Sequence, residues 1–115
     1  MDLAEVYDDY PVITAMQLED LGFCAKGQVV QFIRENTFTH GGTLPLNTSG
    51  GQLSVGQAGA AGGYLGLVEG LRQLTGLALG AGVPDARHAL VSGFGMINYD
   101  RGLCSGAAVL ARGVT

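Results

Sequence analysis

The chain has 115 residues, of which 47% are hydrophobic and 14% charged, and its net charge is −4. This length allows one domain, the six scattered Lys and Arg residues argue against a nucleic-acid-binding surface, and no apolar run reaches the roughly 18 residues of a membrane span. A charged share this far below the usual ~25% predicts that part of the surface is covered in an assembly.

The first part of the chain predicts a strand followed by two helices. We expect the strand over residues 3–7 and the first helix over residues 11–21, ending at Gly22. Asp8 and Asp9 precede this helix, and capping it is a more natural role for them than acting as a carboxylate pair. A second short helix is expected over residues 27–35.

A glycine-rich stretch over residues 47–63 follows a short predicted strand at residues 43–47. Its glycine spacing matches neither the P-loop nor the dinucleotide-binding fingerprint. A backbone with few side chains can approach a ligand closely, and the following helix directs free N–H groups back at the loop. The stretch is therefore a candidate site for an anionic or carbonyl oxygen, with close packing of helix on sheet as the alternative.

The second part of the chain predicts a helix and a hairpin. The helix is expected over residues 60–74, ending at Gly76, with an apolar face formed by Leu67, Val68, Leu71 and Leu74. Strands over residues 88–97 and 103–112 flank a turn at residues 98–102. The order strand, helices, strand, helix, strand, strand predicts an α/β fold with parallel strands joined by crossovers and an antiparallel last pair.

Three stretches in this order resemble the C-terminal half of the thiolase superfamily. Residues 5–10 stand where thiolases carry a Glu-Ala-Asn-Glu-Ala-Phe-like segment and where the sterol-carrier-type branch has His-Asp-Cys-Phe. The family motif Asn-x-x-Gly-Gly matches at Asn47, Gly50 and Gly51. A Cys-x-Gly near the end of family chains matches residues 104–106.

The resemblance covers nearly the whole chain and implies a mixed sheet with helices packed on it, as in sterol-carrier-type thiolases or thiolase-like acetyl-CoA acetyltransferases. It implies that residues 1–115 form a C-terminal domain that is incomplete without an N-terminal half, which in the family carries the nucleophilic cysteine. The implied partners are that half or a homologous subunit, and a small zinc-ribbon/OB-fold protein.

The activity implied by the resemblance is that of an acyl-CoA acyltransferase half-subunit, which processes a carbon–carbon bond beside a coenzyme A thioester and needs no other cofactor. Two alternatives remain: a non-catalytic structural or regulatory subunit, and a component of a thiolase-like retro-aldolase. The missing nucleophile favours the non-catalytic role for the isolated chain.

Cys104, Gln57 and Tyr7 are the catalytic residues that the resemblance implies. The family cysteine at position 104 acts as an acid and base, although a cysteine in an apolar strand is also a common core residue. Gln57 and Ala58 replace the His-Pro of the family's Gly-His-Pro, and glutamine can donate to a thioester oxygen but cannot act as a base. As ordinary residues, Gln57 would be a polar loop side chain and Tyr7 a packed aromatic.

Tyr7 also resembles the tyrosine of thiolase-like steroid side-chain aldolases, which carry Tyr-Asp-Cys-Phe at this point. A phenol there could donate to a carbonyl or serve in acid–base catalysis. The likeness is partial, because a second tyrosine of those enzymes corresponds to Gln57.

The remaining polar and glycine residues have more modest expected roles. The resemblance implies substrate binding by Asn47, Gly50, Gly51 and Gly106, although Asn47 on its own chemistry is suited to fixing the loop backbone. Structural roles are expected for His40, His88 and the buried filler Cys24. The two cysteines lack the spacing of a metal site or a disulfide scaffold, and free thiols predict a cytoplasmic protein.

Overall fold

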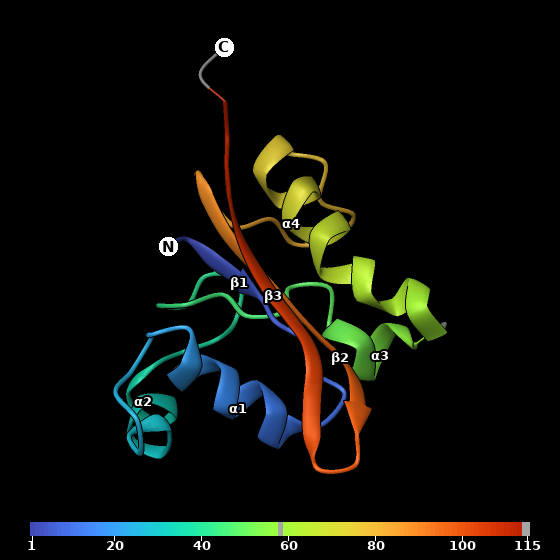
Figure 1. Cartoon of the computed structure of the whole chain (residues 1–115). Helices are drawn as coiled ribbons and strands as arrows, with labels where there is room; N and C mark the ends of the chain where they lie inside the picture. The colour runs from blue at the N-terminus through green and yellow to red at the C-terminus, as the bar shows by residue number, and fades with distance from the viewer. Residues whose placement is uncertain (58, 114–115) are drawn as a thin grey trace.

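A single three-stranded sheet organises the chain (Figure 1), as seen in a computed structural model that describes residues 1–57 and 59–113. Strand β1 (Leu3–Glu5) runs parallel to β2 (His88–Asn98), and β2 pairs antiparallel with β3 (Arg101–Ala111). The strand order is β1-β2-β3. The predicted mixed sheet, with a crossover between parallel strands and a final hairpin, is confirmed.

Helices cover both faces of the sheet. They are α1 (Pro11–Asp20), α2 (Val29–Glu35), α3 (Gly51–Val55), the 3₁₀ helix η1 (Gly59–Tyr64) and α4 (Leu65–Thr75). Because successive strand residues point to opposite faces, Leu3 packs with Leu74 of α4, and Ala4 packs with Leu18 of α1. The two clusters form a core on each side of β1 and β2.

Two predictions for the first half of the chain were wrong. The strand over residues 43–47 is reduced to one bridge, in which Leu46 pairs with Ala4. Tyr10 is the N-cap of α1 and makes no side-chain capping bond, so neither aspartate caps this helix. Asp8 instead turns inward, where it is 6% exposed and bonds the start of α3.

The predicted helix over residues 60–74 is correct only in its later part. Its first turns form η1, and α3 lies unpredicted inside the glycine-rich stretch, where a high glycine content hides helical periodicity. The buried face of α4 is formed by Glu69, Gly70, Gln73 and Leu74. Val68 and Leu71, which the apolar pattern assigned to the core, are 42% and 46% exposed.

Glycines explain why α4 buries this face. A Cβ added to Gly70 would lie 3.2 Å from Cγ2 of Val91, and one added to Gly66 would lie 3.2 Å from Cβ of Glu5. The helix therefore approaches β1 and β2 along its glycine side and buries Leu74, while Val68 and Leu71 of its apolar stripe face outward.

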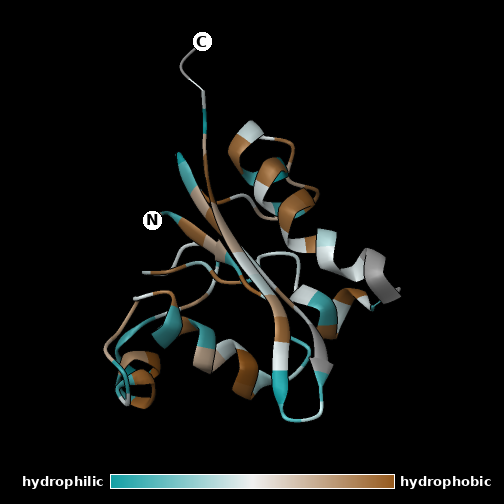
Figure 2. Ribbon diagram, in the orientation of Figure 1, coloured by the Kyte–Doolittle hydropathy of each residue, from teal (hydrophilic) through white to brown (hydrophobic). Residues whose placement is uncertain are grey.

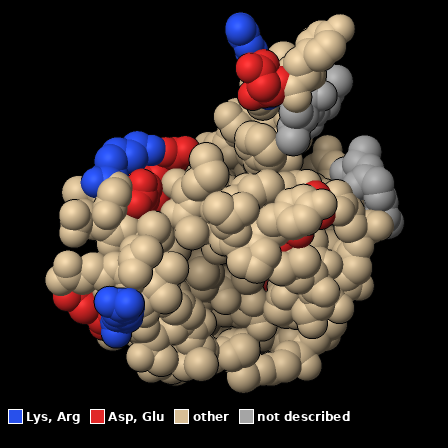
Figure 3. Space-filling model, turned by 90° about the horizontal axis from the view of Figure 1, so that it is seen from below, with Lys and Arg blue, Asp and Glu red and all other residues tan. Residues whose placement is uncertain are grey.

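The exposed surface is poor in charge and rich in apolar side chains. Apolar residues recur along β3 and α4 (Figure 2), and Leu103 and Val109 of β3 are 57% and 60% exposed. The face in Figure 3 is largely uncharged, with its Lys, Arg, Asp and Glu side chains mostly toward the margin. Among the described residues, no helix has the length and apolar character needed to cross a bilayer.

Candidate functional site

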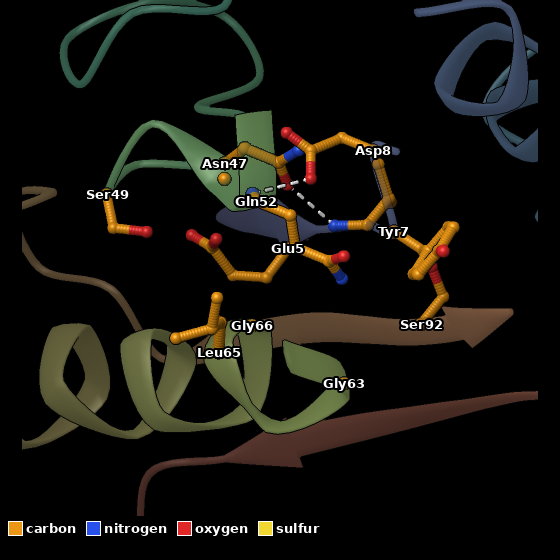
Figure 4. Close-up of a pocket in the computed structure, with 12 residues that line it drawn as sticks. Glu5, Tyr7, Asp8, Asn47, Ser49, Gln52, Gly63, Leu65, Gly66 and Ser92 are labelled. Carbon is orange, nitrogen blue, oxygen red and sulfur yellow. Dashed lines mark hydrogen bonds between the residues drawn. The ribbon is translucent and has the colours of Figure 1, made fainter. Parts of the chain in front are cut away.

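The glycine-rich turn that begins at Asn47 is tied to the end of β1 (Figure 4). The Asn47 N–H donates to the carbonyl of Ala4 at 2.9 Å, and the Val6 N–H donates to Oδ1 of Asn47 at 2.7 Å. The His40 ring donates to the carbonyl of Thr48 at 3.0 Å. These bonds match the structural roles expected for His40 and for Asn47 as a residue that fixes the loop backbone.

Asp8 holds the next part of this turn. Its Oδ1 accepts the Gln52 N–H at 2.7 Å, at the first turn of α3. Gly51 immediately precedes Gln52 and has a left-handed φ of 65°. A Cβ at this position would overlap the Asp8 carboxylate. The second glycine of the Asn-x-x-Gly-Gly motif is thus required by both its backbone conformation and the space that Asp8 fills.

Replacing Gly51 with alanine is expected to lower the free energy of unfolding by about 2–4 kcal/mol, from left-handed strain and loss of the buried Asp8 bond. Urea denaturation of the two proteins measures this difference. Gly41→Ala is the matched control, because a Cβ there meets no atom within 4 Å. Equal stability of Gly51→Ala and Gly41→Ala would contradict the assignment.

Tyr7 is positioned by contacts from α1 and β2. Its carbonyl accepts a bond of 2.6 Å from Nε2 of Gln17, whose Oε1 accepts the Ser92 hydroxyl at 2.6 Å. The Tyr7 and Phe94 rings have centroids 5.9 Å apart and planes inclined by 53°. Both the backbone and the ring of Tyr7, which follows β1, are therefore held by neighbouring side chains.

The Tyr7 phenol lies with Asp9 and Gln57. Desolvation is the main cause that raises the pKa of Tyr7, and a hydrogen bond to the Asp9 carboxylate raises it further, whereas the Gln57 side chain lowers it. At neutral pH the phenol therefore keeps its proton and is a hydrogen-bond donor. Two of the sequence-predicted residues, Tyr7 and Gln57, are brought together here.

A small cavity lies beside these groups, between the turn and α4 (Figure 4). It has a volume of about 10 Å³, which suits one water molecule. Glu5 and Gln52 both line it, and the buried Oε1 of Gln52 makes no hydrogen bond within residues 1–57 and 59–113. The cavity thus presents polar groups but cannot hold a substrate.

Cys104 and Gly106 lie on β3, which pairs with the strand that carries Phe94. Cys104 is exposed and pairs with Gly95 in the hairpin. In the described part of the chain, no hydrogen bond joins it to Tyr7 or Gln57. Gly106 lines a groove of about 360 Å³ between α1 and the hairpin. Ala58, the second replacement in the Gly-His-Pro motif, lies outside the described residues.

Sequence reasoning missed the polar groups that surround the turn. Asp9 was assigned to helix capping, yet its carboxylate meets the Tyr7 phenol. Glu5 and Glu69 are 1% and 6% exposed, although charged residues on a strand and a helix usually indicate solvent-facing positions. The glycines of α4 could have indicated these buried positions in the sequence, because they mark the face of the helix that lies against β1.

Comparison with known proteins gives consistent matches. Residues 1–104 match the family described as "Thiolase C-terminal domain-like". The chain is 44% identical over 89 residues to a 17-hydroxy-3-oxo-4-pregnene-20-carboxyl-CoA lyase of Mycobacterium tuberculosis, covering 77% of this chain and 22% of the relative. It is 48% identical over 50 residues to a steroid side-chain-cleaving aldolase of Thermomonospora curvata, covering 44% and 13%.

A solved structure, the Ltp2-ChsH2(DUF35) aldolase, matches with a TM-score of 0.75 and 32% identity, covering 97% of this chain and 27% of that chain. The present chain therefore spans no more than about a quarter of the length of these relatives.

Proposed function

The chain belongs to the thiolase C-terminal domain-like family, and we propose that it supplies the C-terminal part of an aldolase-type site that cleaves a carbon–carbon bond beside a coenzyme A thioester. The position of Tyr7 just after β1, held by Gln17 and Phe94, carries this proposal, and Gln57 is among the groups that act on its phenol. Relatives named as a carboxyl-CoA lyase and as aldolases support it. The acyltransferase reading of the sequence becomes the second candidate.

Retro-aldol cleavage of a β-hydroxyacyl thioester needs no attacking sulfur. A base removes the hydroxyl proton, the carbonyl forms at the β-carbon, and the bond between the α- and β-carbons breaks. The electron pair passes to the thioester enolate, which is then protonated at the α-carbon. Hydrogen-bond donors at the thioester oxygen stabilise this enolate.

Tyr7 and Gln57 suit two of these steps, the stabilisation of the enolate and its protonation at the α-carbon. A protonated phenol that turns from the Asp9 carboxylate to the substrate can donate to the developing enolate or transfer its proton to the α-carbon. The Gln57 amide is a donor without basicity, so it can stabilise the enolate but not replace the family histidine in thiolysis. The turn at Asn47, Gly50 and Gly51 would place backbone groups beside the substrate.

A partner is part of the proposal. The exposed apolar residues of α4 and of β3 form more apolar surface than a solitary domain needs to expose. We propose that a thiolase-like N-terminal half or homologous subunit covers part of it and completes the acyl-CoA site. The name Ltp2-ChsH2(DUF35) of the related structure supports a further component, for which a zinc-ribbon/OB-fold protein is our candidate.

The proposal is tested by assaying the co-purified complex with two substrates. With 17-hydroxy-3-oxo-4-pregnene-20-carboxyl-CoA, we expect a ketone and a shortened acyl-CoA, detected by mass spectrometry. With acetoacetyl-CoA and free CoA, we expect no thiolysis. Thiolysis without cleavage of the hydroxyacyl-CoA would refute the aldolase assignment in favour of the acyltransferase.

The exposed Cys104 thiol favours the second candidate, a thiolase-like acyltransferase in which Cys104 moves the proton. The variant Cys104→Ala separates the two mechanisms. In the acyltransferase it would remove an acid–base group and lower kcat by about 10²–10⁴-fold. In the aldolase that we favour, Cys104→Ala would leave cleavage within about tenfold of wild type, because Tyr7 supplies the proton.

A further inference from the structure

A buried chain of polar groups links β1, the glycine-rich turn and α4. The Thr48 hydroxyl oxygen lies 2.7 Å from Oε1 of Glu5 and 2.8 Å from Oε1 of Glu69. The Thr48 N–H also donates to Glu5 at 3.1 Å. Glu5 is 1% exposed, Glu69 6% and the neighbouring Gln73 5%, so solvent does not satisfy these groups.

Counting protons shows that one carboxyl group is protonated. A hydroxyl has a single proton to donate, yet Thr48 makes short contacts with two carboxyl oxygens. Both contacts can be hydrogen bonds only if the second proton comes from a carboxylic acid. Two ionised carboxylates around one hydroxyl would repel each other in a site of low polarity.

The proton belongs to Glu5. The amide of Gln73 is oriented, because its Oε1 accepts the Val83 N–H at 2.8 Å, and its Nε2 therefore donates to Oε1 of Glu69 at 2.8 Å. Glu69 thus receives donors, as a carboxylate does. Within the described residues, Oε1 of Glu5 receives only the longer 3.1 Å bond from the Thr48 N–H besides its contact with the hydroxyl, and α4 encloses Glu5 at Gly66.

We propose that Glu5 is a protonated carboxylic acid that donates to the Thr48 hydroxyl, which in turn donates to the Glu69 carboxylate, and that this chain of bonds holds the turn beginning at Asn47. Glu5 and Glu69 are then positioning residues. The positioning role rests on the proposed function, since that turn belongs to the proposed site, whereas the buried proton does not depend on it.

The surroundings of Glu5 agree with this assignment. The ionisable groups that act on it are Glu69 from α4 and Asp8 from the segment before α1, both acidic, and none of the described ion pairs includes it. The pKa of Glu5 is raised from 4.5 to about 7: burial is the main cause, the bonds from Thr48 oppose it, and the negative charges of Glu69 and Asp8 add to it.

Carbon-13 NMR titration of the Glu5 side-chain carboxyl in the 115-residue chain tests the proton directly. The wild-type midpoint is expected near 7. Glu69→Gln removes a like charge and should lower the midpoint. Thr48→Ser keeps the hydroxyl and should resemble wild type, as should the exposed-site control Glu35→Gln. A wild-type midpoint near 4.5 would overturn the proposal.

Stability gives a second readout if a variant folds poorly. Between pH 4.5 and about 7 the folded chain holds a proton at Glu5 that the unfolded chain has lost. The free energy of unfolding should therefore fall as pH rises through this window and level off above it. Glu5→Gln, which keeps a donor, should remove this contribution. An identical pH slope in wild type and Glu5→Gln would also overturn the proposal.

The positioning role is tested in the complex by pH profile. We expect wild-type cleavage to decline above about pH 7 as Glu5 ionises, and Glu5→Gln, whose amide still donates to Thr48, to extend the plateau to higher pH. If wild type and Glu5→Gln have equal pH profiles and the NMR midpoint is near 7, the positioning role is refuted, but the buried proton on Glu5 still stands. Absence of any cleavage with a confirmed midpoint would refute the proposed function alone.

Discussion

Tyr7→Phe is expected to lower kcat for retro-aldol cleavage by the complex about 10²–10⁴-fold, the usual contribution of a positioned acid–base group. The fold should be unchanged, because the ring contact with Phe94 and the bond from Gln17 to the Tyr7 carbonyl do not involve the phenol oxygen. Steady-state kinetics of the purified complexes, with circular dichroism to check the fold, measure the effect.

Tyr10→Phe is the matched control for this variant. Tyr10 lies three residues further on, at the N-cap of α1, and is 64% exposed, so removal of its hydroxyl should leave kcat at the wild-type value. A Tyr7→Phe complex as active as the Tyr10→Phe complex would show that the phenol takes no part in the reaction.

The parts of the fold that were predictable from sequence rest on short-range patterns. The β2–β3 hairpin follows from two apolar runs around a polar turn, and the parallel pairing of β1 with β2 follows from the helices between them. The face that α4 buries was not predictable from its apolar pattern. Val68 and Leu71 face outward, and an apolar stripe that serves an interface has the same periodicity as one that serves a core.

The site was predictable only where a motif marked it. The Asn-x-x-Gly-Gly pattern located the turn, and the likeness to aldolases drew attention to Tyr7. The contacts of Asp8 with Gln52 and of Glu5 with Thr48 join residues more than 40 positions apart. Local propensity carries no information about such pairs, and a helix-capping role for Asp8 was chemically reasonable until tertiary packing gave it another partner.

A second large effect is expected at Gln57. Gln57→Ala should lower kcat about 10²–10³-fold, as removal of one oxyanion-stabilising donor does in other enzymes. The side chain is well placed for this role, because it packs over Gly62, where a Cβ would lie 2.9 Å from its Cγ, and it reaches the Tyr7 phenol. The measurement is kcat of the complex at saturating hydroxyacyl-CoA, with the exposed Gln31→Ala as control.

Gln57→Met distinguishes donation from packing. Methionine has nearly the length of glutamine but no N–H donor and no charge. If Gln57 acts as a donor, Gln57→Met should be about as impaired as Gln57→Ala. If packing over Gly62 is its only role, Gln57→Met should cleave the substrate nearly as fast as wild type, and enolate stabilisation would then have to come from the backbone N–H groups of the turn or from the partner subunit.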